Sequence, residues 1–111
     1  MATRIILRSA SGVGTTETAI GDVIAPPAGV KWTLVEIRVR ASAAATVRIY
    51  FDTELYHEIR TPITPGAYPR PHTVTLDVMQ PHMLTVKGFA DAATADIEAE
   101  LVIEESPAGP A

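Results

Sequence analysis

Cysteine and asparagine are both absent from this 111-residue chain, and Gln80 is its only glutamine. Without cysteine there is no disulfide framework, no thiolate nucleophile and no cysteine-ligated metal. Arginine outnumbers lysine seven to two, and alanine is abundant. Two explanations stay open for this composition. A GC-rich genome favours Ala, Arg, Gly and Pro codons, and selection for chemical durability removes thermolabile Asn and Cys.

Charge and hydropathy exclude further classes of protein. The formal net charge of -4 argues against nucleic-acid binding, which needs a basic face. Apolar runs such as Ile5 to Leu7 are far too short to span a bilayer. The N-terminus has an early arginine but no apolar segment ending in a small-residue cleavage site, so we expect no secretion signal. The length predicts a single domain with one core.

Period-2 alternation with β-branched residues recurs along the chain and is punctuated by Pro and Gly, whereas helical periodicity is hard to find. We therefore predict an all-β fold, a single antiparallel β-sandwich, jelly-roll-like, with seven to eight strands. The expected strands are residues 19–24, 32–41, 46–52, 55–60, 74–78, 83–90 and 96–103, with 3–8 as the eighth.

The alternation also predicts which side chains face the core. In the 32–41 strand, the expected inward residues are Val35, Ile37 and Val39, and the outward ones are Glu36, Arg38 and Arg40. In the 46–52 strand, Val47, Ile49 and Phe51 are expected to point inward. Ile97, Ala99, Leu101 and Ile103 are the expected inward residues of the last strand, and Gly88 is expected at a β-bulge.

The domain organisation follows from composition. The polar stretch SASGVGTTET at residues 9–18 predicts a flexible tether, so residues 1–18 are interpreted as a strand-forming N-terminal arm. The β-sandwich domain then spans residues 19–105, and 106–111 form a C-terminal tail. Residues 61–72, TPITPGAYPRPH, contain four prolines, which predict a stiff, exposed loop.

A search for catalytic or metal-binding groups is negative. His72 and His82 start neighbouring predicted strands, so they approach each other only if the register allows, and His57 has no obvious partner. We interpret all three as surface or turn histidines and predict no metal and no cofactor.

Nucleophiles and paired acids are no more promising. The pairs Asp52/Glu54 and Glu98/Glu100 have the spacing of outward side chains on one strand face, which is typical of a solvated surface. Serines fall in small-residue loops or tails without a nucleophile elbow. SGVG at 11–14 lacks the lysine and helix of a phosphate-binding loop. We therefore predict that the protein is not an enzyme.

Binding surfaces remain. Trp32, Tyr50, Tyr56 and Tyr68 could form a sugar-stacking platform, although Trp32 equally suits the end of a core. Tyr68, in the proline-rich loop, is a candidate anchor for a protein partner. Arginines of the 32–41 strand and glutamates of the last strand form two charged stripes. Either these stripes pair within one sheet, or an arginine face on one subunit meets an acidic face on the next.

The stretch VIAPPAGVKWTLVEIRV, residues 23–39, resembles an element of small β-sandwich structural proteins of tailed-phage and related virus particles. IYFDTELYHEI, residues 49–59, is similar to their paired central strands. The resemblance implies a virion structural protein on the capsid surface. Within that class it favours a head decoration or cement subunit. Its expected partners are the major capsid protein or another virion protein and further copies of itself, with a trimer favoured.

From these observations we predict a set of partner-binding residues. They are Arg4, Ile5, Ile6, Leu7, Arg8, Arg38, Arg40, Tyr68, Arg70, Glu98 and Glu100. The alternatives are a tail, fibre or connector protein and a carbohydrate-binding module. Outside a virion, the expected location is the cytoplasm.

Overall fold

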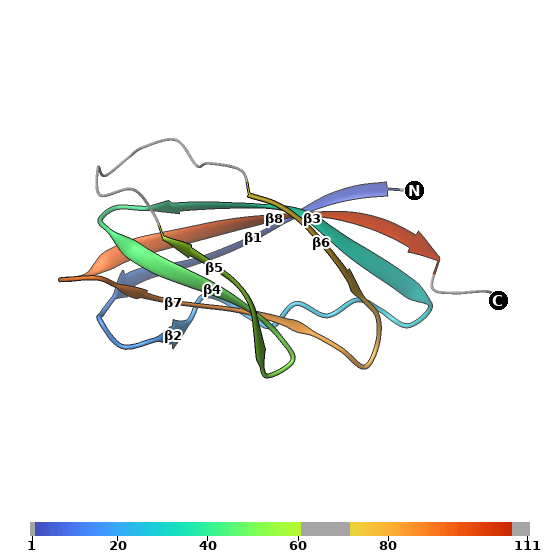
Figure 1. Ribbon diagram of the computed structural model, residues 1–111, viewed down its shortest axis with the longest axis horizontal. Coiled ribbons are helices and arrows are strands. Elements are labelled where there is room, and N and C mark those ends of the chain that lie inside the picture. Colours follow the sequence, from blue (N-terminus) through green and yellow to red (C-terminus); the bar gives the residue numbers. More distant parts are fainter. Residues whose placement is uncertain (1, 61–71, 108–111) are drawn as a thin grey trace.

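The computed structural model describes residues 2–60 and 72–107, which form eight β-strands in two antiparallel four-stranded sheets (Figure 1). The first sheet has the order β1-β8-β3-β6 and the second β2-β7-β4-β5. The strands are β1 (Ala2–Val13), β2 (Thr18–Ala19), β3 (Val30–Ala41), β4 (Ala45–Phe51), β5 (Glu54–Arg60), β6 (His72–Val78), β7 (Leu84–Ala90) and β8 (Ala95–Pro107). The described residues include no helix long and apolar enough to cross a membrane.

The strand pairing is that of a jelly roll. β1 pairs with β8, β2 with β7, β3 with β6 and β4 with β5, as in one long hairpin of four strand pairs. Rolling this hairpin up brings β8 beside β3 and β7 beside β4. The result is the two-sheet, eight-stranded architecture of jelly rolls. The predicted fold class is confirmed.

Side chains from the inner faces of both sheets form one apolar core. Alternation works as predicted in β8, where every second residue from Ala95 to Ile103 is buried. Val47 and Ile49 of β4 are fully buried, and Phe51 packs against the core from the strand end. Burying a side chain of this size contributes about 1.5–3 kcal/mol.

A β-bulge in β3 corrects part of the predicted inner face. The register towards both β6 and β8 shifts between Leu34 and Glu36. Trp32 and Leu34 are buried before the bulge and Ile37 and Val39 after it, while Val35 is only half-buried. The expected inward position of Val35 was therefore wrong, because the extra residue of a bulge reverses the parity of the alternation.

The structure of the N-terminal residues differs from the predicted domain boundaries. The segment 1–18 was interpreted as an arm on a flexible tether, but Ala2–Val13 form the edge strand β1, paired with β8 along its length. The register shifts only between Ala10 and Val13, where Gly12 has φ 62°. At the other end, β8 continues to Pro107, beyond the predicted limit at residue 105. Residues 2–13 and 106–107 thus belong to the sandwich.

Two further expectations for strands differ from the structure. The 19–24 strand is reduced to Thr18–Ala19 and an isolated bridge between Ile24 and Leu84, because Gly21 has φ 74° and turns the chain out of the ladder. Gly88 is not at a bulge, since it pairs with Val47 in an unbroken register. Its role is close packing, because a Cβ there would lie 3.0 Å from the carbonyl oxygen of Thr46.

Candidate functional site: the outer face of β1, β8 and β3

Six of the predicted partner-binding residues lie together on the outer face of β1, β8 and β3, which we call the β1–β8–β3 face. Register and burial place them in rows across the three strands. Leu7 is opposite Glu100, which is opposite Arg38. Ser9, Glu98 and Arg40 form the next row, and Ile5, Val102 and Glu36 form the row on the other side. Residues far apart in the chain, such as Ile5 and Glu100, are thereby brought to one surface.

The charges on this face are only partly neutralised within the chain. Arg38 contacts Glu36 at 2.7 Å and Glu100 at 3.8 Å, so the interpretation of cross-strand pairing within one sheet holds for this arginine. Such exposed pairs contribute at most about 1 kcal/mol each. Arg40, Glu98 and Glu104 make no ion pair within residues 2–60 and 72–107. These three side chains keep their charges available at the surface.

Apolar side chains lie at the β1 side of the same face. Ile5 is 62% exposed and Leu7 is 50% exposed, and their neighbour Val102 is only half-buried. Isolated exposed aliphatic residues are ordinary on protein surfaces. Two of them on one edge strand, next to a third on the adjacent strand, form a continuous apolar area that a partner could cover.

The end of the face where β8 begins carries an open hollow of about 580 Å³. The carboxylate of Asp96 accepts a hydrogen bond from the Gly12 N–H at 2.9 Å, and the Asp96 N–H donates to the Ser42 hydroxyl at 2.8 Å. These two hydrogen bonds hold the rim of the hollow in place, and Arg40 and Glu98 line its wall. The described lining residues are Ser9, Ala10, Ser11, Arg40, Ala41, Ser42, Asp96, Ile97 and Glu98.

The structure separates the other predicted partner-binding residues from this face. Arg4 binds Glu105 at 3.2 Å, and Ile6 packs against the core. Arg8 lies over Gly21, and its guanidinium donates to the carbonyl oxygens of Asp22 and Leu7 at 2.9 and 3.0 Å. Arg4, Ile6 and Arg8 point the opposite way because successive residues of a strand alternate between its faces. Tyr68 and Arg70 lie outside the described residues.

Trp32, one of the residues considered for a sugar-stacking platform, lies in the core. Trp32 is 9% exposed and donates from its indole N–H to Glu105 at 3.1 Å. That hydrogen bond, together with Arg4, holds the pKa of the Glu105 carboxyl below its usual range despite some burial. The Tyr56 hydroxyl donates to the carbonyl oxygen of Thr75 at 3.1 Å. None of the described residues lining the hollow is aromatic.

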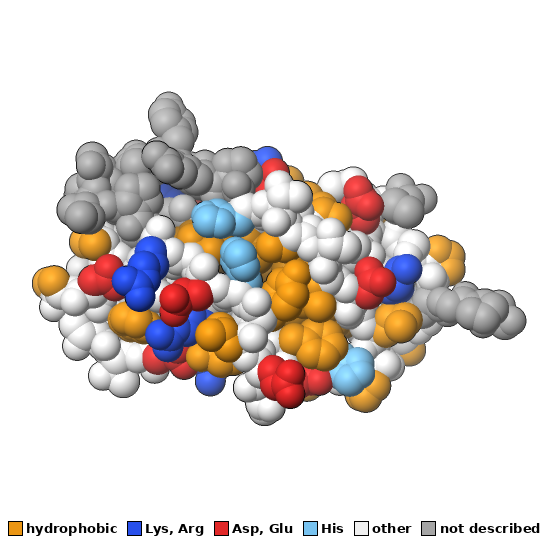
Figure 2. Space-filling model, in the orientation of Figure 1, with side chains coloured by type: hydrophobic (Ala, Val, Ile, Leu, Met, Phe, Trp, Pro, Cys, Tyr) orange, Lys and Arg blue, Asp and Glu red, His pale blue; other side chains and the backbone are white. Residues whose placement is uncertain are grey.

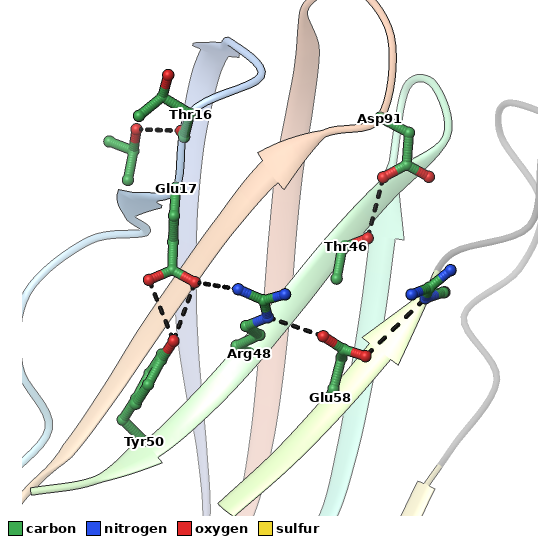
Figure 3. A network of polar contacts seen from close by, with 9 residues as sticks. Thr16, Glu17, Thr46, Arg48, Tyr50, Glu58 and Asp91 are labelled. Atoms are coloured by element: carbon green, nitrogen blue, oxygen red, sulfur yellow. Dashed lines mark hydrogen bonds and ion pairs between the residues drawn. The ribbon is translucent and has the colours of Figure 1, made fainter. Parts of the chain in front are cut away.

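Arg48 belongs to a polar network on the other sheet, which the sequence did not predict (Figure 3). Arg48 contacts Glu58 at 2.7 Å and Glu17 at 2.8 Å, and the Tyr50 hydroxyl donates to Glu17 at 2.9 Å. Burial raises the pKa of Glu17, but the hydrogen bonds from Arg48 and Tyr50 outweigh it and lower that pKa. Hydrogen bonds to Glu58 and Glu17 raise the pKa of Arg48. The network ties the segment before β2 to β4 and β5.

Two histidines meet where β5 and β6 approach each other, next to an apolar patch, while the third lies apart (Figure 2). The ring centroids of His57 and His72 are 5.6 Å apart, and the buried His57 Nε2 atom has no hydrogen-bond partner among residues 2–60 and 72–107. His82 instead contacts Asp52 at 2.7 Å, so the histidines that approach each other are not the pair considered from the sequence. Among the described residues, no three His, Asp or Glu side chains are placed to hold a metal ion.

The His57 environment predicts a loss of stability on mild acidification. Burial lowers the pKa of His57 from its ordinary value of 6.5, and the neighbouring His72 lowers it further. The unfolded chain therefore binds a proton first as the pH falls, so the free energy of unfolding should decrease as the pH falls below about 6.5 and through the lower folded-state pKa. Urea unfolding at several pH values should show this decrease in the wild type and a smaller one in His57→Gln. Identical pH profiles for the two proteins would contradict the prediction.

No protein-family model matches this sequence, and no curated protein matches it. The class of protein is therefore described by fold and surface alone. The chain is a jelly-roll β-sandwich whose β1-β8-β3-β6 sheet presents apolar and charged side chains on the β1–β8–β3 face.

Proposed function

We propose that the chain is a virion structural protein, a head decoration or cement subunit that stabilises a capsid through protein–protein contacts. The observation that carries the proposal is the β1–β8–β3 face, where exposed Ile5 and Leu7 share a surface with Arg40 and Glu98, two charged residues that make no ion pair among the described residues. Viral capsid proteins are among those that use the jelly roll, as are lectins. Because one fold hosts many functions, the proposal rests on the face and on the resemblance of residues 23–59 rather than on the fold alone.

The face has the properties of a protein-binding surface. Its side chains stand on strands that are hydrogen-bonded into a sheet, so a partner would order few groups on binding. Apolar Ile5 and Leu7 would lie at the centre of the contact, and the charges around the hollow at its rim. The charged rim would select the orientation of a partner with complementary charges.

A carbohydrate ligand has less support. Trp32 is buried in the core, so its ring is not available for a sugar to stack on, and the Tyr56 hydroxyl is bonded to Thr75 across the β5–β6 gap. The hollow contains serine hydroxyls and charges but no aromatic side chain among its described residues. This surface therefore favours a protein partner.

The proposal is tested by looking for the chain in particles. Virus particles are purified by density gradient from a culture that expresses the chain from its native gene, and peptide mass spectrometry measures its abundance in each fraction. We expect the chain to sediment with the particles at a fixed ratio to the main shell protein. A chain found only in particle-free fractions would contradict the proposal, and glycan-array binding by that free chain would favour the sugar-binding alternative.

Two charge reversals test the role of the face. Arg40→Glu changes the rim of the hollow, and Arg60→Glu changes an arginine of β5, on the other sheet, whose side chain is 77% exposed. We expect Arg40→Glu to reduce particle-bound chain about tenfold, which corresponds to about 1.4 kcal/mol of binding free energy. Arg60→Glu should leave the bound amount unchanged. Equal effects of the two changes would exclude the β1–β8–β3 face as the binding surface.

A further inference from the structure

We propose that two copies of this chain pair through their β1 strands, antiparallel and about a two-fold axis that passes next to Ile6. The β1-β8-β3-β6 sheets of the two copies would then join into one continuous eight-stranded sheet. This inference does not depend on a virion role, because it concerns how the chain recognises a second copy of itself.

The first observation is that β1 is an open edge. It pairs with β8 on one side and, within the described residues, with no strand on the other. An unpaired edge offers a row of backbone N–H and C=O groups to another strand, and proteins usually block such edges with proline, very short strands, β-bulges or charged side chains. β1 has twelve residues and no proline. By contrast, β2 has two residues, and β5 and β6 are linked by the Tyr56–Thr75 hydrogen bond.

The second observation is that the sequence of β1 is a chemical palindrome about Ile6. Residues 2–10 read ATRIILRSA, so the flanking pairs are Ile5 with Leu7, Arg4 with Arg8, Thr3 with Ser9 and Ala2 with Ala10. The regular register with β8 covers the same residues and shifts only after Ala10. In a two-fold contact, residue i meets residue j of the partner while j meets i. Because the sequence of β1 reads similarly in both directions, each side chain would lie opposite a chemically similar side chain of the second copy.

The pairing creates apolar clusters on both faces of the joined sheet. A two-fold axis perpendicular to the sheet keeps the outward residues of both copies on the same face. Two residues that lie opposite each other must therefore both have odd numbers or both have even numbers, so their sum is even. A sum of 12 places Ile5 opposite Leu7 of the second copy and Ile6 opposite Ile6. Ile5, Leu7 and Val102 of both copies then form one outer apolar cluster. On the inner face, the two Ile6 side chains continue the row of Leu101.

The arginines do not oppose this arrangement. The proposed register brings Arg4 opposite Arg8 of the second copy, and like charges directly opposite are unfavourable. Arg4, however, is neutralised by Glu105 at 3.2 Å. The Arg8 guanidinium is directed onto the carbonyl oxygens of Asp22 and Leu7 in its own chain. Both guanidinium groups are therefore already bound within their own subunits.

The symmetry makes the proposal distinct from the trimer that the resemblance to virion proteins implies. A contact of one strand with the same strand of a second copy uses both edges and closes at two subunits, whereas a ring of three needs two different surfaces on each subunit. The joined sheet leaves the outward side chains of β8 and β3, including Arg40, free for another partner.

Light scattering coupled to size-exclusion chromatography tests the pairing, with Leu7→Lys and a matched control. Leu55→Lys makes the same change at a leucine that is 53% exposed, compared with 50% for Leu7, but on β5. We expect wild type and Leu55→Lys to have twice the mass of one chain and Leu7→Lys to have the mass of one chain. Circular dichroism melts should show that Leu7→Lys stays folded. A wild type that is monomeric or trimeric at all concentrations, or a Leu7→Lys protein that remains dimeric, would overturn the proposal.

Single cysteines test the register, because the chain has no cysteine of its own. In the proposed register Ile6 is opposite itself, so Ile6→Cys should form a disulfide-linked dimer under mild oxidation. Ile5→Cys and Leu7→Cys should crosslink to each other when mixed but poorly to themselves. Efficient self-crosslinking of Ile5→Cys or Leu7→Cys without any of Ile6→Cys would overturn the two-fold at Ile6.

Discussion

Leu101→Ala should lower the free energy of unfolding by about 2–5 kcal/mol, which is the usual cost of a leucine deletion in a closed core. Leu101 is fully buried on β8, the strand that lies between β1 and β3. Its neighbours across the sheet are Ile6 on one side and Ile37 on the other. Because strands hold these neighbours on both sides, the cavity left by the deletion cannot collapse. For a domain of this size, the loss corresponds to a decrease in Tm of roughly 10 °C or more.

Leu55→Ala is the matched control for this experiment. The chemical change is the same, but Leu55 is 53% exposed on β5, so its truncation should change stability by no more than about 0.5 kcal/mol. Urea unfolding followed by tryptophan fluorescence measures both variants, since Trp32 is the only tryptophan and lies at the core. Similar losses in the two variants would contradict the assignment of Leu101 to the core.

Gly88→Ala should destabilise the protein by about 1–3 kcal/mol through overpacking. The added Cβ would lie 3.0 Å from the backbone carbonyl oxygen of Thr46, which belongs to the paired strand β4 and cannot rotate away. The same Cβ would lie 3.4 Å from the Ile97 Cδ1 atom and 3.5 Å from that of Ile20. The single methyl group thus crowds the neighbouring strand and the core together.

Gly14→Ala provides the control, because a Cβ at Gly14 would meet no atom within 4 Å and the residue has no positive φ. There the loss of backbone freedom in the unfolded chain should leave stability unchanged or increase it by up to about 1 kcal/mol. Differential scanning calorimetry of the two variants compares the effects directly. A Gly88→Ala protein as stable as Gly14→Ala would mean that β4 and β7 are further apart than the structure places them.

Sequence patterns predicted most of the secondary structure but few of the contacts that build the candidate site. Period-2 alternation correctly placed Ile97, Leu101 and Ile103 in the core, because the alternation of side chains between faces is a local property of each strand. The same reasoning misplaced Val35, since nothing in the stretch WTLVEI marks the bulge between Leu34 and Glu36. Composition also misled for residues 9–18, whose glycines and serines predict a tether although residues 9–13 complete β1.

The positions of the charged residues show why the site needed the tertiary structure. Arg38 and Arg48 have equivalent outward positions in strands that follow each other in the chain. The structure places Arg38 on β3 in one sheet and Arg48 on β4 in the other, so they lie on different outer faces. The alternation of odd and even positions tells which side chains share a face of one strand. It does not tell to which sheet that strand belongs.

The sequence by itself determined that this chain forms strands, which of their side chains are apolar, and that no cysteine chemistry takes part. The tertiary structure decided the partners, because the pairings that make the jelly roll join distant residues such as Ala2 with Glu105 and Trp32 with Val78. Those pairings depend on how well two complete faces pack together, and no local pattern encodes that. The physical reason is that alternation is fixed by backbone geometry within a strand, whereas strand order is fixed by the burial of a core to which all eight strands contribute.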